Sequence, residues 1–112
     1  LKKQPLTYLK GKVKDSWCPI PNEQVAHIES QQKKTWFYAE GEMYSIIYTL
    51  KELSHLLPNN FLRIHRSYIV NIQSIVDISR DLSSMIQLSL KDGTVLPVSQ
   101  TYTNQVRTKL GF

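Results

Sequence analysis

Residues 61–71, FLRIHRSYIVN, constrain the fold more than any other stretch of this 112-residue chain. The stretch begins with alternating side chains, with Leu62 and Ile64 on one face and basic residues on the other, which is typical of a β-strand. It turns at the polar pair Arg66-Ser67 and resumes as an apolar run that ends at Asn71. The pattern therefore predicts two strands joined by a basic corner.

The basic corner has two interpretations. A charged side chain at the end of a strand is held by a rigid element and still points into solvent, where it is available to an anionic partner. A surface strand whose charges only face water gives the same pattern. The stretch alone leaves both interpretations open.

The other apolar segments are also short, and turn signals separate them. Asp92-Gly93 tolerates positive φ and predicts a hairpin, whereas the two prolines within Trp17–Pro21 predict an edge segment. A basic loop at Gln31–Lys34 and an acidic turn at Glu40–Glu42 lie at opposite ends of one expected strand. The expected strands are 6–13 with an interruption near Gly11, 17–21, 25–30, 35–39, 43–48, 61–65, 68–71 with an apolar continuation to 78, 86–90 and 95–98; a helical turn is expected at 22–24, and further turns at 15–16, 79–81 and 91–94.

Helical signals occur in two places. Thr49 followed by Glu52 forms a capping box, and the next leucines recur at helical spacing until residues 58–60 end the helix. A weaker pattern covers residues 99–110 and stops at Gly111. Because strands and helices do not alternate, the pattern does not favour a doubly wound parallel sheet. The predicted fold is mainly β, with elongated antiparallel sheets, one short amphipathic helix and a weak C-terminal helix.

The chain length predicts one domain that can bury a core without disulfides or metal. Its apolar runs are far shorter than the roughly 20 residues needed to cross a bilayer, and its single cysteine implies no oxidising compartment. These features predict a cytoplasmic protein with no membrane contact. The first residue is Leu1 and not Met, so we expect a piece of a longer protein. A net charge of +5 and a pI near 9.4 favour a polyanionic partner such as nucleic acid.

The groups needed for catalysis are not gathered in the sequence. His27, His55 and His65 fall in different elements and at none of the close spacings of a zinc site. Cys18 has no histidine near it in sequence, and the glycines form no phosphate-binding loop. We therefore expect neither an enzyme nor a bound cofactor or metal.

Residues 61–71 closely resemble the signature of LytTR domains, the DNA-binding output modules of LytR/AlgR-type response regulators. The flanking segments also match the family in order: Ile28–Ser30, Leu50–Leu53, Asp92-Gly93 with Leu96–Ser99, and the aromatic Tyr102. The resemblance covers about residues 8–110. It implies one LytTR-like domain within residues 1–112, at the C-terminal end of a longer bacterial two-component regulator of transcription.

The resemblance also implies a mode of binding. LytTR-like β-β-β sandwiches place loops, not a recognition helix, into successive major grooves of bent double-stranded DNA. Their sites are promoter direct repeats, usually with one domain per repeat, so dimerisation on DNA and contact with the transcription machinery are expected partners. Residues that correspond to the family's DNA contacts are Lys33, Lys34, Thr35, Trp36, His65, Arg66, Ser67, Gln100 and Thr101.

Roles can be assigned to these residues from their chemistry. Lys33 and Lys34 suit phosphate, which positions a protein without specifying sequence, whereas the planar fork of Arg66 matches guanine. For His65, a hydrogen bond that holds the corner is favoured over DNA contact. Gln100 stands where many family members carry arginine, and glutamine suits adenine. Thr35 likewise replaces a longer polar or basic residue, so the first loop depends on its lysines.

Two other functions are also compatible with the sequence. A protein-interaction module would expose the Trp17–Pro21 edge or the aromatic strand Trp36–Tyr38. A single-stranded nucleic-acid-binding module would use Trp36 and Tyr38 as stacking platforms. Competition between duplex DNA and single strands separates these alternatives from duplex binding.

Overall fold

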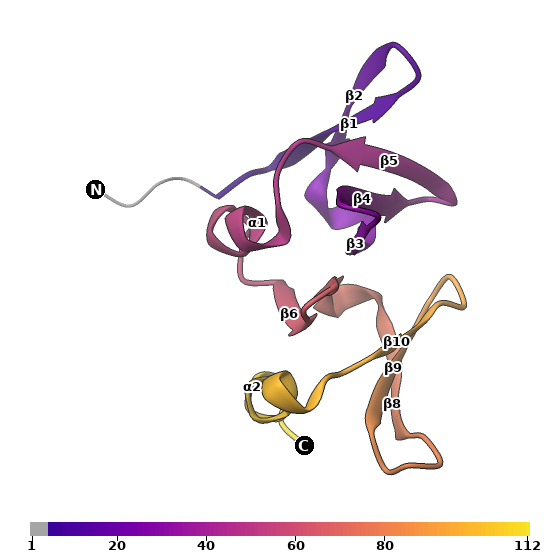
Figure 1. The fold of residues 1–112 in the computed structure, drawn as a ribbon, viewed down its shortest axis with the longest axis vertical. Helices are drawn as coiled ribbons and strands as arrows, with labels where there is room; N and C mark the ends of the chain where they lie inside the picture. Colours follow the sequence, from indigo (N-terminus) through magenta and orange to yellow (C-terminus); the bar gives the residue numbers. More distant parts are fainter. Residues whose placement is uncertain (1–4) are drawn as a thin grey trace.

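Ten strands in two sheets make up about half of residues 5–112, the part of the chain that this computed structural model describes (Figure 1). Seven strands form one sheet in the order β2-β1-β5-β4-β3-β7-β6, and three form the other in the order β10-β9-β8. Every pairing is antiparallel, which confirms the predicted mainly β class. The strands are β1 (Tyr8–Val13), β2 (Ser16–Pro21), β3 (Val25–Gln31), β4 (Lys34–Ala39), β5 (Glu42–Ile46), β6 (Phe61–His65), β7 (Tyr68–Asn71), β8 (Ile75–Arg80), β9 (Ile86–Leu90) and β10 (Val95–Pro97).

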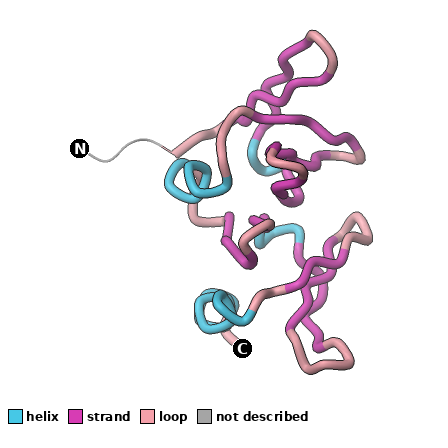
Figure 2. The backbone as a smooth tube through the Cα atoms, in the orientation of Figure 1, coloured by secondary structure: helices cyan, strands magenta, loops and turns pink. Residues whose placement is uncertain are grey.

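Both predicted helices are present, and Figure 2 shows them on the same side of the view. The capping box of α1 has both of its hydrogen bonds: the Glu52 N–H donates to Thr49 Oγ1 at 3.1 Å, and the Thr49 N–H donates to Glu52 Oε1 at 2.9 Å. Gly111 ends α2 in the left-handed conformation, with φ 78°. The helices are α1 (Leu50–Leu56) and α2 (Thr103–Leu110), and the 3₁₀ turns are η1 (Asn22–Gln24), η2 (Ile72–Ser74) and η3 (Gln100–Tyr102).

Strand β7 is shared by two hydrophobic cores. Successive side chains of a strand point to opposite faces, so Ile69 enters one core and Val70 the other, and both are buried. Ile64 of the neighbouring β6 joins the core of Val70. Figure 1 shows β6 between the β1–β5 and α1 region above and the β8–β10 and α2 region below. The β6–β7 hairpin therefore connects the two halves of the domain.

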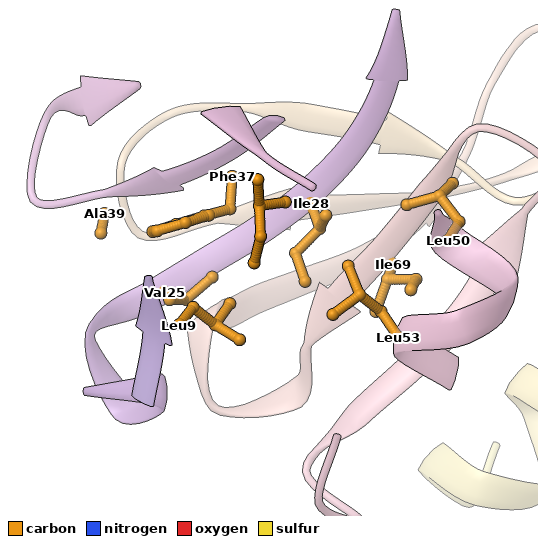
Figure 3. Packing of buried hydrophobic residues seen from close by; sticks show 9 residues of the cluster. Leu9, Val25, Ile28, Phe37, Ala39, Leu50, Leu53 and Ile69 are labelled. Carbon is orange, nitrogen blue, oxygen red and sulfur yellow. The ribbon is translucent and has the colours of Figure 1, made fainter. Parts of the chain in front are cut away.

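Different elements contribute to the two cores. The first gathers residues of β1, β3, β4, β5 and α1 against β7 (Figure 3); its buried members are Leu9, Val25, Ile28, Phe37, Ala39, Ile46, Leu50, Leu53 and Ile69. The second joins β6 and β7 to the small sheet and α2; its buried members are Ile64, Val70, Ile86, Leu88, Leu90, Leu96, Val98 and Val106. Burial of this apolar area is the main stabilising term of such a domain.

Asn71 is fully buried at the end of β7 and is satisfied by hydrogen bonds. Its amide Nδ2 donates to the Val25 carbonyl at 2.9 Å, and its Oδ1 accepts from the Gln73 N–H at 3.0 Å and from Asn60 Nδ2 at 3.2 Å. An unpaired amide in this place would be costly. Asn71 therefore stabilises the turn that follows β7 and links it to β3.

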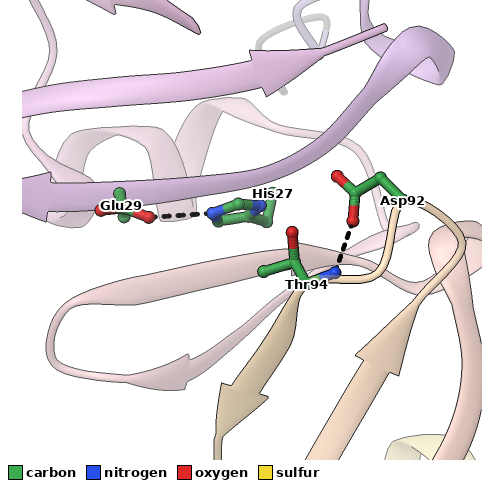
Figure 4. A network of polar contacts seen from close by, with 4 residues as sticks. All are labelled: His27, Glu29, Asp92 and Thr94. Atoms are coloured by element: carbon green, nitrogen blue, oxygen red, sulfur yellow. Dashed lines mark hydrogen bonds and ion pairs between the residues drawn. The ribbon is translucent and has the colours of Figure 1, made fainter. Parts of the chain in front are cut away.

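Figure 4 shows a second buried polar group where the two sheets meet. His27 of β3 is 2% exposed, and its Nε2 lies 2.9 Å from Glu29 Oε1. Its ring stacks on Tyr38 with centroids 4.5 Å apart. The β9–β10 turn, with Asp92 and Thr94, lies beside it. His27 is thus packed within the structure and is not a surface group.

Several element boundaries differ from the expected ones. The expected interruption near Gly11 is wrong, because β1 continues through this residue. The turn expected at 79–81 begins only at Asp81, whose Oδ1 accepts from the Ser83 and Met85 N–H groups at 2.8 and 2.9 Å. Strand β5 ends at Ile46, two residues earlier than expected.

Gly11 is required by packing, and this generates a stability prediction. A β-carbon at this position would lie 2.5 Å from Tyr44 Cβ and 2.7 Å from Phe37 Cζ, closer than real contacts allow. We expect Gly11→Ala to lower the free energy of unfolding by about 1–3 kcal/mol, the usual cost of overpacking. Urea denaturation measures it, with Lys10→Ala on the exposed face of β1 as the control. Equal stability of the two variants would contradict the packing argument.

Candidate nucleic-acid interface

Two turns of the large sheet lie at the same end of that sheet. One joins β3 to β4, and the other joins β6 to β7. Strands β3 and β7 are antiparallel neighbours in which Glu29 pairs with Tyr68. Just beyond that pair, the Ser30 N–H donates to the Ser67 carbonyl at 2.9 Å. The sheet therefore brings together two basic turns that are more than thirty residues apart in the sequence.

The β3–β4 turn is tighter than the loop that the sequence predicts. Gln31 and Lys34 form the last pair of the hairpin, so only Gln32 and Lys33 lie outside the strands. Both have positive φ, 52° and 65°, which is the conformation of two-residue hairpin turns. Lys33 and Lys34 are exposed, and Lys34 Nζ lies 5.8 Å from the centroid of the Trp36 ring. The turn thus holds two cations at fixed positions.

The next two residues of β4 point to opposite faces of the sheet. Thr35 lies on the face of Phe37 and is only 8% exposed. Strand β4 thus contains Thr35, as the sequence predicts, although it begins one residue earlier than expected, at Lys34. The burial of Thr35 leaves little of its side chain for the DNA contact that the family resemblance implies. Trp36 lies on the opposite face and is half-buried.

The β6–β7 corner is held by hydrogen bonds from two neighbouring side chains. His65 Nδ1 accepts from the Ser67 N–H at 3.0 Å. The Arg63 guanidinium donates to the carbonyls of His65 at 2.8 Å and Arg66 at 2.6 Å. These contacts agree with the corner-holding role favoured for His65. The Arg66 side chain is exposed and has no hydrogen-bond or carboxylate partner among residues 5–112.

The environment of the corner favours the neutral form of the His65 ring. Partial burial lowers its pKa below the ordinary 6.5, and the nearby positive charges of Arg66 and Arg63 lower it further. A neutral ring whose Nδ1 accepts a hydrogen bond carries its proton on Nε2. The corner's cationic character therefore comes from its arginines.

A third expected contact segment lies next to β6. The Ser99 N–H donates to the Ile64 carbonyl at 3.0 Å, which docks the start of η3 one residue before His65. The Arg63 guanidinium lies 5.8 Å from the centroid of the Tyr102 ring and spans the same junction. Gln100 and Thr101 follow Ser99 and are exposed. The structure thus places η3 beside the end of β6 that leads into the corner.

Acidic side chains are kept away from the two turns. Glu40 and Glu42 lie at the opposite end of β4 from Lys34, as the sequence predicts. Glu29 is the exception: it lies in β3 opposite Trp36, with its Oε1 2.9 Å from His27 Nε2. The end of the sheet that carries both turns is therefore predominantly basic, which favours an anionic partner.

Other kinds of site receive no support from the described residues. Within residues 5–112, no three His, Cys, Asp or Glu side chains gather as a metal site would require. Neither α1 nor α2, the helices of this part of the chain, has the length and apolarity to cross a membrane. Of the two surfaces that a protein-interaction module would expose, the strand Trp36–Tyr38 has its central residue Phe37 fully buried, whereas Trp17 of the Trp17–Pro21 edge is exposed.

An antiparallel β domain that presents basic turns at one sheet end has the features of a β-sheet nucleic-acid-binding protein. The chain belongs to the LytTR family, because the family model described as the LytTr DNA-binding domain matches residues 15–111. The resemblance found in the sequence is thereby confirmed. This family is a class of DNA-binding regulatory domains and not a class of enzymes.

Solved and curated relatives agree with this assignment. A LytTr DNA-binding domain from Bacillus cereus superposes with a TM-score of 0.91 at 39% identity, covering 96% of this chain and 99% of that one. The sensory transduction protein LytT of Bacillus subtilis is 37% identical over 60% of the chain, and the transcriptional regulatory protein YpdB of Escherichia coli is 32% identical over 78%. The chain spans only 28% and 36% of the lengths of these two relatives.

Arg63 is the residue whose role the sequence analysis missed. In the alternating pattern of β6 it resembles any exposed basic residue, and no local signal separates it from Arg66. Only the turn that follows brings the carbonyls of His65 and Arg66 within reach of its guanidinium. Arg63 therefore orders the corner, whereas Arg66 extends from it.

The lowered pKa of His65 predicts a pH-dependent stability. Since the unfolded residue protonates near pH 6.5 and the folded one only at lower pH, the corner's contribution is complete above 6.5 and is lost as the pH falls below it. We expect the wild type to lose more unfolding free energy between pH 7.5 and 5.5 than His65→Asn, whose amide oxygen can still accept from Ser67. Urea titrations at both pH values measure this. Parallel losses would contradict it.

Proposed function

We propose that this domain binds specific sites in double-stranded DNA by inserting loops, among them its neighbouring β3–β4 and β6–β7 turns, into the major groove. The observation that carries the proposal is the Arg66 guanidinium, which extends unpaired from a corner held by His65 and Arg63. A preorganised arginine fork matches the O6 and N7 acceptors of guanine. Membership in a DNA-binding family supports the same assignment.

The remaining contacts follow from position and chemistry. Lys33 and Lys34 contact phosphates and fix the register of the domain on the duplex. Ser67, Trp36, Gln100 and Thr101 add polar or stacking contacts beside them. His65 acts by holding the corner, and Thr35 is not part of the proposed contact set because it is buried.

In the cell, we propose that the domain is the output module of a cytoplasmic response regulator of transcription. Its sites are direct repeats in promoters, on which two copies bind side by side and meet the transcription machinery. The names of its relatives, a sensory transduction protein and a transcriptional regulatory protein, support this proposal.

Selection of binding sites from random duplex DNA tests the proposed function. We expect the selected duplexes to share a repeated consensus sequence. Unlabelled duplex DNA of that sequence should compete for the protein, whereas the corresponding single strands should not. Preference for single strands would favour stacking on exposed aromatic rings. The packing of Tyr38 against His27 argues against that mode, because one face of the ring is already covered.

Arg66→Ala is the sharpest test of base readout. We expect the variant to lose about 1–3 kcal/mol on the selected site and to discriminate less between sites that differ at one position. Gel-shift titrations on matched and mismatched duplexes measure both effects. Unchanged affinity and unchanged preference would remove Arg66 from the interface.

Lys33→Ala tests phosphate contact. We expect the variant to bind selected and unrelated duplexes more weakly, to a similar extent for both. The slope of log K against log salt concentration should fall in magnitude by about one. Lys51→Ala, which removes an exposed charge from α1, serves as the control and should leave the slope unchanged. A loss confined to the selected site would instead make Lys33 a base contact.

A further inference from the structure

The β1–β2 hairpin adds a second group of lysines to the face of the large sheet beside the β3–β4 turn. A hollow of about 350 Å³ is lined by Lys12, Lys33 and Lys34, together with Trp17. A second hollow of about 370 Å³ is lined by Lys12, Lys14 and Lys34. Lys12 of β1 and Lys14 of the β1–β2 turn therefore share one surface with Lys33 and Lys34. None of the described residues that line either hollow is acidic.

The strand register explains why these cations share a face. Lys12 pairs with Ser45 of β5, and Ser45 pairs with Trp36 of β4. Residues directly opposite each other in an antiparallel sheet project from the same face, and Lys34 shares the face of Trp36 because it is two residues away. Lys12 is also positioned over the Trp17 ring, with Nζ 5.3 Å from the centroid.

The contacts proposed so far do not use these cations. Lys12 and Lys14 precede residue 15, where the match to the family model begins. Neither forms an ion pair with another residue of 5–112. The hairpin lysines are thus a feature of this chain outside the matched family region, placed next to a surface that is proposed to meet DNA.

Lysines on two neighbouring hairpins, beside a DNA-contacting turn, match the backbone of the same duplex better than a small anion. Five inter-strand steps of about 4.8 Å separate β1 from β6, a distance of about 24 Å. Phosphates follow one strand of DNA at about 3.4 Å per base pair. The hairpin lysines therefore reach phosphates about seven base pairs from the contact of Arg66.

We infer that Lys12 and Lys14 form a phosphate-binding extension that grips the duplex flanking the recognition site. The inference rests on the proposed function, because it assumes that the β3–β4 turn faces DNA. The extension contributes affinity and no base preference, since phosphate contacts carry no sequence information directly. Its effect depends on the length of the flanking DNA.

The experiment compares the wild-type domain with Lys12→Ala/Lys14→Ala on two duplexes. Both contain a single copy of the selected repeat; one extends ten base pairs beyond it on each side, and the other ends at its borders. On the long duplex we expect the double variant to bind several-fold more weakly, with a salt slope lower by about two. On the short duplex the two proteins should bind alike. Lys12→Arg/Lys14→Arg, which keeps both charges, should show the wild-type salt slope on the long duplex.

Lys51→Ala/Lys109→Ala is the matched control, because it removes two exposed lysines from the helices and lowers the net charge equally. The inference is overturned if this control behaves like the hairpin variant, which would indicate long-range attraction. It is also overturned if the hairpin variant is equally weakened on both duplexes, which would show that its lysines do not act through the flanking DNA. Unchanged thermal midpoints show that the variants are folded. Failure of the wild type to bind any duplex would instead refute the proposed function.

Discussion

The β6–β7 hairpin is the constraint on which the rest of the structure depends. Ile69 packs into one core and Val70 into the other, so both halves of the domain need this hairpin in one register. A shift by one residue would exchange the two side chains between the cores. Asn71 closes the hairpin with buried hydrogen bonds to the Val25 carbonyl and the Gln73 N–H. The Arg66-Ser67 corner lies at the opposite end of the same hairpin, so its backbone is positioned by both cores.

Rigidity at the corner is what makes a single arginine useful. The Arg63 guanidinium and the neutral His65 ring satisfy backbone groups of the turn, which leaves Arg66 as the group that extends into solvent. A side chain on a fixed backbone loses less freedom on binding than one on a mobile loop. The docking of Ser99 on Ile64 brings η3 to the same place. The proposed interface is thus built from segments that the cores position.

Much of the fold could be predicted from local patterns, and the errors have physical causes. The capping box at Thr49 and the Asp92-Gly93 hairpin were predicted because both depend on neighbours in the sequence. Gly11 was interpreted as a strand interruption, because its need for space comes from Tyr44 and Phe37, which are distant in sequence. Lys34 was placed in a loop because the polar run Gln31–Lys34 conceals a two-residue turn.

The sequence by itself determined the class of the domain, its family and the identity of the basic corner, because strand periodicity, turn residues and a specific eleven-residue run are local properties. Tertiary structure decided which groups act together. The strand order β4-β3-β7-β6 brings the two turns to one end of the sheet, and the pairing of Lys12 with Ser45 adds the hairpin lysines beside them. Such neighbours arise from long-range pairing and packing, which no local pattern specifies.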